Sequence, residues 1–268
     1  MEEPAQPCKL CGSNAPLVKS HIIPTSFLFP FDQQPVADPP DGETSGTYRI
    51  MGDIESMHPS RAPTGIYDRF LCCDCENLFD PWDDYAFKLL CERRGERKRI
   101  ERENRLIAEL YESFEYVKLK LFFMSLLFRA ALSDGLFWQH IRLGPHESRL
   151  RDLVKRADPG EQNDFPVCLA RFSNSDQTPI FLPPFRTRFQ GVSFYRFYLG
   201  IVIAHIKVDR QRISAPMNLA VMSDGNPLYL RNYEYSGSAE QKALRGIFGN
   251  PTNIRLMERY TNSTLAIV

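Results

Sequence analysis

The sequence predicts an α+β protein with an N-terminal zinc-bound unit, central helices, and a β-rich C-terminal region that ends in a helix. Two CxxC pairs lie near the N-terminus, and a long apolar helical pattern occupies the middle of the chain. After that pattern, residues 165–235 carry short runs of Val, Ile, Phe and Tyr between prolines and glycines, as antiparallel strands do. We therefore divide the chain into a zinc-binding domain over 1–92 and a second region over 93–268.

Composition narrows the class of protein. The 268 residues are 43% hydrophobic and 25% charged, which excludes a wholly disordered or fibrous chain. Thirty-three basic and 33 acidic residues cancel, so any nucleic-acid binding has to come from a local patch. The acidic start MEEPAQPC is no secretory signal, and the apolar stretches are shorter than the roughly 20 residues that a membrane helix needs. We expect a cytoplasmic protein without a membrane partner.

The N-terminal elements are expected in a fixed order. A strand over 18–23 follows the first cysteine pair, and a long loop over 25–65 separates it from a second strand over 65–71. The second strand runs into the second cysteine pair. A helix then begins near Asp80, which would be its N-cap, with Pro81 at the first helical position.

The rest of the chain reads as helices and then strands. The stretch 92–105 holds seven Lys/Arg and four Asp/Glu and predicts a solvated helix or hinge. The stretch 106–132 is helical in pattern and apolar almost all round, as in a buried central helix. Another helix begins at Pro145, and the capping-box pattern Ser238-x-x-Gln241 predicts the final one.

Four cysteines form the strongest motif. Cys8-x-x-Cys11 and Cys72-x-x-Cys75 are two knuckles, and two knuckles make the tetrahedral four-thiolate site that zinc prefers. Sixty residues separate the pairs, so the pairing is inferred from the knuckles and not from the interval. The alternatives are free buried thiols, or Cys73 in place of Cys72. Seven cysteines, an odd number, favour an intracellular metal site over a disulfide framework.

His21 is the first candidate for chemistry. On a strand its side chain points opposite to those of Ser20 and Ile22. A lone histidine in a strand is normally a packed or hydrogen-bonded residue. Its place between two knuckles, the second of which leads into an acidic helix, favours a functional role.

The order CxxC, strand with His-Ile-Ile-Pro, strand, Leu-Cys-x-x-Cys, helix resembles the HNH endonucleases, whose core is a zinc-stapled ββα-metal, treble-clef-like unit. More closely, KSHIIP…GIYDRFLCCDCENLF is similar to bacterial HNH-like proteins, some of them associated with antiviral (phage) defence. The resemblance covers about residues 8–90. It implies a nuclease that hydrolyses phosphodiester bonds of DNA, or of RNA, with a divalent metal ion.

The resemblance also implies roles for single residues. His21 matches the general base, and Asp68 lies near the middle Asn of the family pattern. Glu76 takes the place of the final His or Asn, which binds the catalytic Mg²⁺ or Mn²⁺, and Asn77 is a second candidate. Ser20 stands where many members have a metal-binding Asp, and Ser is a poor ligand. The site would then need Asp68, Asp80 or a substrate phosphate to complete it.

Nucleic-acid contacts are expected from basic residues near this unit. Candidates are Lys19, Arg69, Arg93, Arg94 and Arg97. The acidic residues interleaved with the last three also fit an exposed, ion-paired face. The zero net charge favours a regulated effector that depends on a protein partner or on homo-oligomer formation. The alternative is a non-catalytic zinc-binding module for nucleic-acid or protein recognition.

A second basic and aromatic stretch lies further along. Arg186, Arg188 and Arg196 alternate with aromatic residues over 185–198, a texture found on nucleic-acid surfaces. We favour a sheet with one aromatic core face and arginines on the other, because strand alternation alone produces this pattern.

Overall fold

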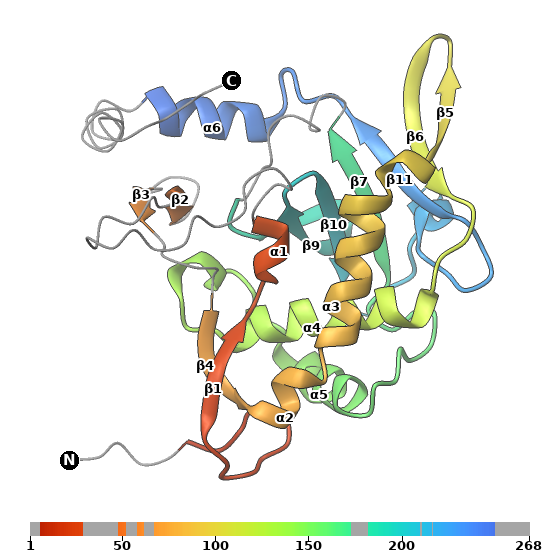
Figure 1. The fold of residues 1–268 in the computed structure, drawn as a ribbon. Coiled ribbons are helices and arrows are strands. Elements are labelled where there is room, and N and C mark those ends of the chain that lie inside the picture. Colours follow the sequence, from red (N-terminus) through yellow and green to blue (C-terminus); the bar gives the residue numbers. More distant parts are fainter. Residues whose placement is uncertain are drawn as a thin grey trace.

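The computed structural model describes residues 6–28, 48–51, 58–61, 67–172, 182–209, 211–215 and 217–249. At the N-terminus, β1 (Leu17–His21) pairs antiparallel with β4 (Tyr67–Cys72). Two short helices follow, α2 (Cys73–Asn77) and α3 (Asp80–Phe87). This hairpin unit lies at the lower left of Figure 1. Asp80 is the first residue of α3, and Phe79, not Asp80, is its N-cap.

Three short elements lie between the two strands of the hairpin. They are α1 (Thr25–Leu28) and the strands β2 (Tyr48–Met51) and β3 (His58–Arg61), which pair antiparallel. The remainder of the expected 25–65 loop is outside the described residues.

A seven-stranded sheet fills the other side of the molecule, in the order β5-β6-β11-β7-β10-β9-β8. All neighbours are antiparallel except β11 and β7, which are parallel. Its strands are β5 (Lys98–Arg102), β6 (Arg105–Tyr111), β7 (Val167–Phe172), β8 (Phe185–Phe189), β9 (Val192–Leu199), β10 (Val202–Lys207) and β11 (Leu228–Tyr233).

The central helix is α4 (Tyr116–Leu132), which crosses the middle of the molecule in Figure 1. Nearly all of its residues are buried, as the apolar pattern predicts. It packs on α3 and on α5 (Glu147–Lys155), and α6 (Ala239–Gly249) follows the last strand. Single turns complete the fold at η1 (Lys88–Glu92), η2 (Arg93–Glu96), η3 (Leu136–Trp138), η4 (Gly144–His146) and η5 (Met217–Ala220).

Two predictions about the middle of the chain are wrong. The charged stretch 92–105 is not a helix: after a turn it forms β5, and β6 follows where the helix was expected to begin. A tight turn at Glu103 and Asn104, both at positive φ, makes these strands a hairpin whose charged side chains lie in solvent. Over so short a stretch, the charge pattern of an exposed edge strand cannot be distinguished from that of a solvated helix.

One hydrophobic core joins the parts. The same buried cluster contains Ile22 and Phe70 of the hairpin unit, Phe122 of α4, and Leu169 and Phe197 of the large sheet. The core therefore runs across the predicted boundary at 92/93, although the two regions differ in secondary structure. Within the described part of the chain, none of the helices has the length and apolar character needed to cross a membrane.

Candidate zinc centre and the adjoining hairpin

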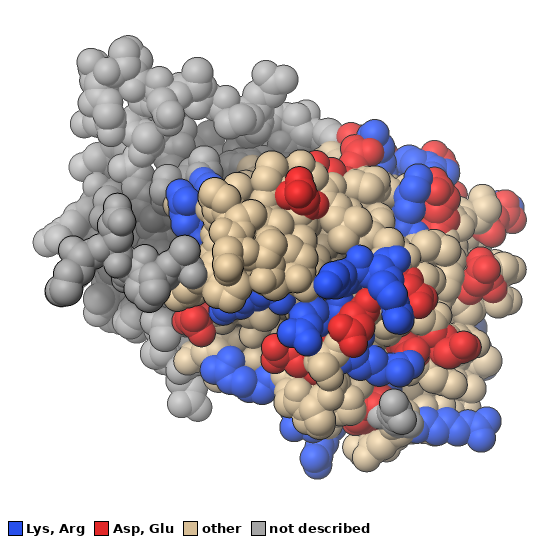
Figure 2. All heavy atoms as spheres, turned by 90° about the horizontal axis from the view of Figure 1, so that it is seen from below, with Lys and Arg blue, Asp and Glu red and all other residues tan. Residues whose placement is uncertain are grey.

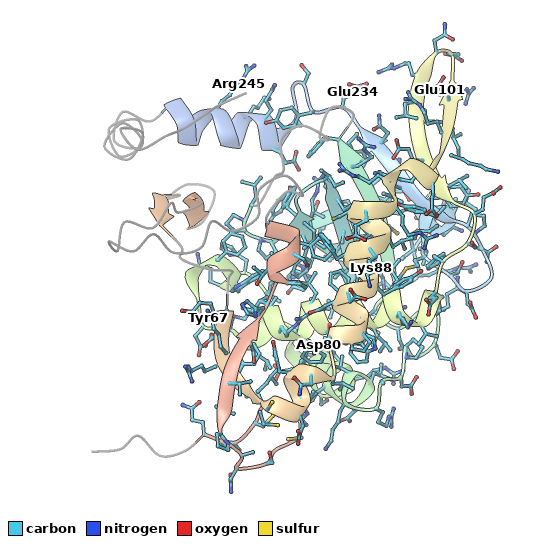
Figure 3. The ribbon with its side chains drawn as sticks, in the orientation of Figure 1. Tyr67, Asp80, Lys88, Glu101, Glu234 and Arg245 are labelled. Carbon is cyan, nitrogen blue, oxygen red and sulfur yellow. The ribbon has the colours of Figure 1, made fainter. Side chains whose placement is uncertain are left out.

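Four sulfurs meet at one end of the hairpin. The Sγ atoms of Cys8, Cys11, Cys72 and Cys75 all lie within 4.8 Å of one another. Those of Cys11 and Cys72 are 3.7 Å apart. A tetrahedral zinc ion with Zn–S bonds of about 2.3 Å places its sulfurs about 3.8 Å apart, so the donors fit zinc in both chemistry and spacing. Figure 3 shows the sulfurs gathered beside α2.

Backbone geometry explains why the two knuckles meet. The first knuckle closes when the Gly12 amide donates to the Cys8 carbonyl at 2.8 Å, with Gly12 at φ 80°, a conformation that glycine adopts without strain. The Lys9 amide donates to the Phe70 carbonyl at 2.9 Å and so fastens this knuckle to β4. The Cys72 amide donates to the Cys8 sulfur at 3.4 Å. These hydrogen bonds hold the two knuckles side by side, so the four sulfur atoms lie close together.

The thiols of this centre differ in acidity. Hydrogen bonding with Ser13 lowers the pKa of Cys11 to about 6, which favours the thiolate. Burial, together with the neighbouring sulfurs, raises the pKa of Cys75. A bound divalent cation would lower the pKa of Cys75 again, because a thiol that coordinates a metal is deprotonated. Cys73 is exposed and points elsewhere: it accepts a hydrogen bond from the Asn77 amide at 3.6 Å.

The outer face of the β1–β4 hairpin is basic and aromatic. The Lys19 Nζ lies 3.7 Å from the centre of the Tyr67 ring, and the His21 ring meets the same tyrosine edge-on at 6.2 Å. Arg69 is two residues beyond Tyr67 on β4, so it belongs to the same face, and it is exposed. We call Lys19, His21, Tyr67 and Arg69 the outer face; it contains no carboxylate. Figure 3 labels Tyr67 at the outer side of the hairpin.

The inner face carries the other predicted residues. Ser20 is the cross-strand partner of Asp68. The Asp68 carboxylate accepts two hydrogen bonds, one from the backbone amide of Arg69 at 2.7 Å and one from the Ser133 hydroxyl at 3.0 Å. Asp68 therefore tethers β4 to the end of α4.

Glu76 contacts the backbone of His21. Its Oε1 accepts the His21 amide at 3.1 Å. Its Oε2 is buried, as is the Ser20 hydroxyl, and neither has a hydrogen-bonding partner among the described residues. Burial raises the pKa of Glu76, while the positive charge of Arg129 opposes this shift. The carboxylate thus lies on the Ser20 side of the strand, away from the face that carries the imidazole.

Arg129 also contacts His21, although no sequence motif indicated a role for this arginine. Its guanidinium is fully buried and donates to the His21 carbonyl at 2.7 Å. It also forms a bidentate ion pair with Asp83 of α3, in which both N–O distances are 2.8 Å. His21 is therefore held through its amide by Glu76 and through its carbonyl by Arg129. We call Glu76, Asp83 and Arg129 the clamp. The available signal was an arginine in the mostly apolar C-terminal half of the central helix.

The clamp is charged inside the core. Burial raises the pKa of Asp83, and the neighbouring Arg129 acts in the opposite direction. Ionised groups are retained in such surroundings only when they are paired and hydrogen-bonded. Here the pairing joins α3 and α4 to β1, at the residue that the sequence singles out.

The inner face does not by itself form a site for Mg²⁺ or Mn²⁺. Within the described residues, the four cysteines are the one group of three or more His, Cys, Asp or Glu side chains close enough to share an ion. Near Glu76, the buried oxygen atoms without a hydrogen-bonding partner among the described residues are one carboxylate oxygen of Glu76 and the Ser20 hydroxyl. The positive charge of the buried Arg129 acts on the same carboxylate. The residues present therefore do not fit a catalytic divalent ion.

The other expected contact residues are dispersed. Asn77 is exposed and bonded to Cys73, apart from His21. Arg97 is buried and pairs with Glu109 at 2.7 Å, and Arg93 pairs with Glu96. Arg94 lies in the same turn, η2. The exposed, ion-paired alternative thus describes Arg93, which lies in a turn and not on a helical face, whereas Arg97 is ion-paired but buried.

Charge elsewhere is mixed. Figure 2 shows one face of the molecule, on which Lys and Arg alternate with Asp and Glu without a large field of one sign. Comparison of the chain with protein-family models, with curated proteins and with solved structures gives no match, so the role of this site rests on its own chemistry.

Proposed function

We propose that this chain is a nuclease that binds the backbone of DNA, or of RNA, on the outer face of the hairpin and uses His21 as the general base. The observation that carries the proposal is the outer face itself. Lys19 and the imidazole of His21 both contact the exposed ring of Tyr67, and Arg69 is exposed on the same face of β4. Lys and Arg bind phosphates, and an aromatic ring stacks on bases.

The clamp supports the proposal through the backbone of His21. A general base works only when it is held within hydrogen-bond reach of the proton it removes. Glu76 and Arg129 fix both peptide groups of His21, so they act as positioning residues. The imidazole would take a proton from water as the water oxygen attacks phosphorus and the sugar oxygen leaves.

A divalent ion is implied by the resemblance to HNH endonucleases. The residues around Glu76 do not fit such an ion, so the assay below measures the metal requirement of the reaction directly. The zinc centre does no chemistry in this proposal. It staples a small hairpin whose outer side faces solvent. The balanced charge of the chain fits an effector that works with a partner chain or under a regulating signal.

The second candidate function is recognition without cleavage. The specific observation in its favour is that the Glu76 carboxylate is buried and engaged with the backbone, which a purely structural role also explains. In that case the outer face binds nucleic acid or a partner chain, and His21 packs on Tyr67.

Plasmid nicking by zinc-loaded protein tests the proposal. Wild type is compared with His21→Ala and with His140→Ala, an exposed histidine far along the chain, in the presence of Mg²⁺, of Mn²⁺ or of EDTA. General-base assistance contributes about 10²–10⁴-fold, so nicking should fall by that factor in H21A and stay unchanged in H140A. Equal nicking by all three proteins would refute the assignment of His21.

Binding separates the two candidates. Lys19→Gln with Arg69→Gln should weaken binding of a short labelled duplex or single strand by about tenfold or more and flatten its salt dependence, because two phosphate contacts are lost. Lys88→Gln, a surface lysine outside this face, is the matched control. Binding that requires the outer face, without cleavage by wild type, would favour recognition alone.

A further inference from the structure

The seven-stranded sheet has a second face, which is turned away from the main core. Leu169, Phe197 and Leu230 point into the core, and the residues that alternate with them along the strands point to the other side. Two smaller apolar clusters form on that side. One contains Ala170, Phe172, Leu182, Tyr198 and Ile203. The other contains Cys168, Val192, Phe194 and Met217. We call this side of the sheet the second face.

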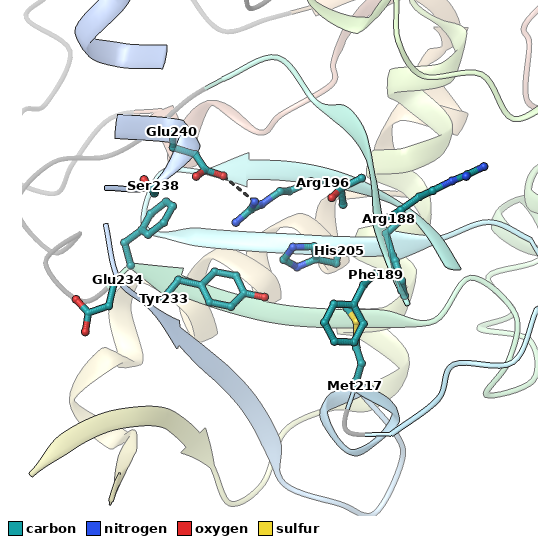
Figure 4. A pocket seen from close by; sticks show the side chains of 12 residues that line it. Arg188, Phe189, Arg196, His205, Met217, Tyr233, Glu234, Ser238 and Glu240 are labelled. Atoms are coloured by element: carbon teal, nitrogen blue, oxygen red, sulfur yellow. Dashed lines mark ion pairs between the residues drawn. The ribbon is translucent and has the colours of Figure 1, made fainter. Parts of the chain in front are cut away.

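A cavity of about 380 Å³ lies on the second face (Figure 4). The cross-strand pairs of β8 and β9 show which side chains can reach it. Thr187 pairs with Phe194, and both line the cavity. In the next pair Arg188 donates to the Ser193 hydroxyl at 3.4 Å, so the side chain of Arg188 lies on the opposite face of the sheet. The volume falls within the range of about 300–1,000 Å³ that is usual for small-molecule sites.

Aromatic rings form much of the cavity wall. Phe172, Phe189, Phe194 and Tyr233 all line it. In the view of Figure 4, the rings of Tyr233 and Phe189 lie on either side of His205. Offset-stacked and edge-to-face contacts between rings stabilise a complex beyond the burial of apolar area. Walls of this kind therefore favour a ligand that is itself aromatic.

The charges along the cavity are neutralised within the protein. The Arg196 Nη1 lies 2.7 Å from the Glu240 Oε1, and the Tyr198 hydroxyl donates to the same oxygen at 2.6 Å. Glu234 is paired with Arg105 at 3.4 Å. A ligand would thus meet no net charge, which favours an uncharged molecule over an anion or a cation.

His205 gives the cavity a polar group. It is the cross-strand partner of Arg196, so both side chains are on the second face. His205 is 5% exposed, and its Nδ1 has no hydrogen-bonding partner among the residues that the structure describes. Burial, helped by the positive charge of Arg196, lowers the pKa of His205 to about 3. The imidazole is therefore neutral at physiological pH and offers one donor and one acceptor.

We propose that this cavity binds an uncharged aromatic molecule that carries a hydrogen-bonding group. The ring would pack against Phe189 and Tyr233, and the polar group would bond to the imidazole of His205. A carboxylate or a phosphate would find no unpaired cation in the described lining. A saturated ring would lose the contacts between aromatic rings, and a purely apolar ring would leave the imidazole unpaired. The site is separate from the outer face of the hairpin and does not depend on the proposed nuclease activity.

Three probes of one shape test the proposal by NMR titration of the full zinc-loaded chain. Benzamide is aromatic and uncharged, benzoate replaces its amide by an anion, and cyclohexanecarboxamide keeps the amide on a saturated ring. Benzamide should bind with a Kd of about 1 mM, the affinity expected of so small a ligand. Benzoate and cyclohexanecarboxamide should each bind at least about tenfold more weakly.

Two variants separate the wall from the polar group. Phe189→Ala removes one ring of the wall and should weaken benzamide by about fivefold. His205→Phe keeps the ring but removes both nitrogens, and should weaken benzamide by about tenfold. Because Phe189 is only half-buried, on the edge strand β8, its variant stays interpretable even if His205→Phe fails to fold.

Arg188→Gln is the matched control, since Arg188 neighbours Phe189 on β8 and its side chain lies on the opposite face. The Lys19→Gln, Arg69→Gln protein should also bind benzamide as wild type does. Three outcomes would each overturn the proposal: no binding of benzamide, binding of benzoate as tight as that of benzamide, or equal loss in R188Q and F189A.

Discussion

The hairpin unit and the seven-stranded sheet bury their residues by different means. In the hairpin unit, two strands of five and six residues are stapled by four cysteines, and one face stays in solvent. The large sheet carries apolar residues on both faces, and β7 and β10 are buried along their whole length. The comparison teaches that strands packed on one face alone leave the other face open to polar side chains, whereas packing on both faces buries the central strands of the large sheet completely.

The two regions still meet along α4. Apolar residues of both enter one core, and Arg129 of α4 holds the His21 carbonyl across 108 positions of sequence. Four cysteines that could hold a metal ion thus meet within the hairpin unit, and the buried ion pair of Arg129 with Asp83 connects the unit to the rest of the molecule. The following experiments separate these contributions.

Zinc removal should have the largest effect. Structural zinc contributes about 10–16 kcal/mol of apparent binding free energy in small zinc-finger peptides, so Cys72→Ser or chelation should unfold the hairpin unit. Hydrogen exchange should then rise in 8–28 and 67–77, while β7 and β10 stay protected. Cys73→Ser, an exposed cysteine of the same knuckle, should keep one zinc per chain. Unchanged exchange in the hairpin after verified zinc loss would contradict the staple.

Breaking the clamp should come next. Arg129→Met leaves Asp83 buried without its partner, which costs about 3–5 kcal/mol in the free energy of unfolding. Adding Asp83→Asn should recover part of that loss, because the unpaired charge is then removed. The pair of Asp84 and Lys88 is the control: both are exposed, so replacing them should change stability by less than about 1 kcal/mol. The free energies of unfolding are measured by denaturant titration. If the effects of Arg129→Met and Asp83→Asn simply add, the two residues do not stabilise the protein as an ion pair.

Replacing Lys120 should stabilise the protein. This lysine of α4 is buried, its Nζ has no hydrogen-bonding partner among the described residues, and burial lowers its pKa to about 8. Since the pKa of Lys120 in the folded protein lies below the ordinary lysine value of 10.5, the unfolded chain binds more protons between these two pH values. The contribution of Lys120 to the free energy of unfolding therefore rises with pH from about 8 to 10.5. Lys120→Met should gain on the order of 3 kcal/mol at pH 7.

Melting curves of wild type and K120M at several pH values check this prediction. The advantage of the variant should shrink as pH rises through that window, because the neutral lysine no longer carries a buried charge. A difference that is independent of pH would mean that packing, and not charge, distinguishes the two proteins.

Glu76→Gln should have the smallest effect, and it sharpens the role of the clamp. The amide oxygen can still accept the His21 amide, so a positioning role predicts nicking within about threefold of wild type. Glu76→Ala removes the acceptor and should lower nicking further. Because burial raises the pKa of Glu76, the folded chain holds this proton more tightly, and the destabilisation from ionising it appears as pH rises through the acidic range. E76Q should lack that pH dependence.

If Glu76 instead binds a catalytic ion, E76Q should lose activity as completely as E76A. The ratio of the two variants therefore decides between positioning and metal binding. Circular dichroism at the assay pH shows whether either variant has lost its fold.

Local pattern was enough for some of this architecture. The CxxC spacing predicted the four-cysteine centre, and the all-round apolar run predicted that α4 is buried. The Ser238 pattern marks the start of α6, where the Ser238 hydroxyl accepts the Gln241 amide at 3.0 Å. Each of these signals is complete within a few neighbouring residues.

What local pattern missed depends on distant partners. Arg129 gains its role from Asp83 and His21, which lie on other elements. Arg196 was assigned to the outside of a sheet, but its partner Glu240 comes from α6 and buries it over the cavity. The β5–β6 hairpin is charged on its exposed residues, and what fixes it as a pair of strands is the ladder of β6 with β11, more than a hundred residues later.

The wide sequence interval between the two cysteine knuckles has a consequence for engineering. The entropy lost in closing a flexible loop grows only with the logarithm of its length, so doubling the segment costs about 0.6 kcal/mol. That is small beside the affinity of a four-thiolate site for zinc. A peptide tag or fluorescent reporter placed between 28 and 48 should therefore leave the metal centre assembled, which makes this interval the natural place to label the chain without altering the surface around His21.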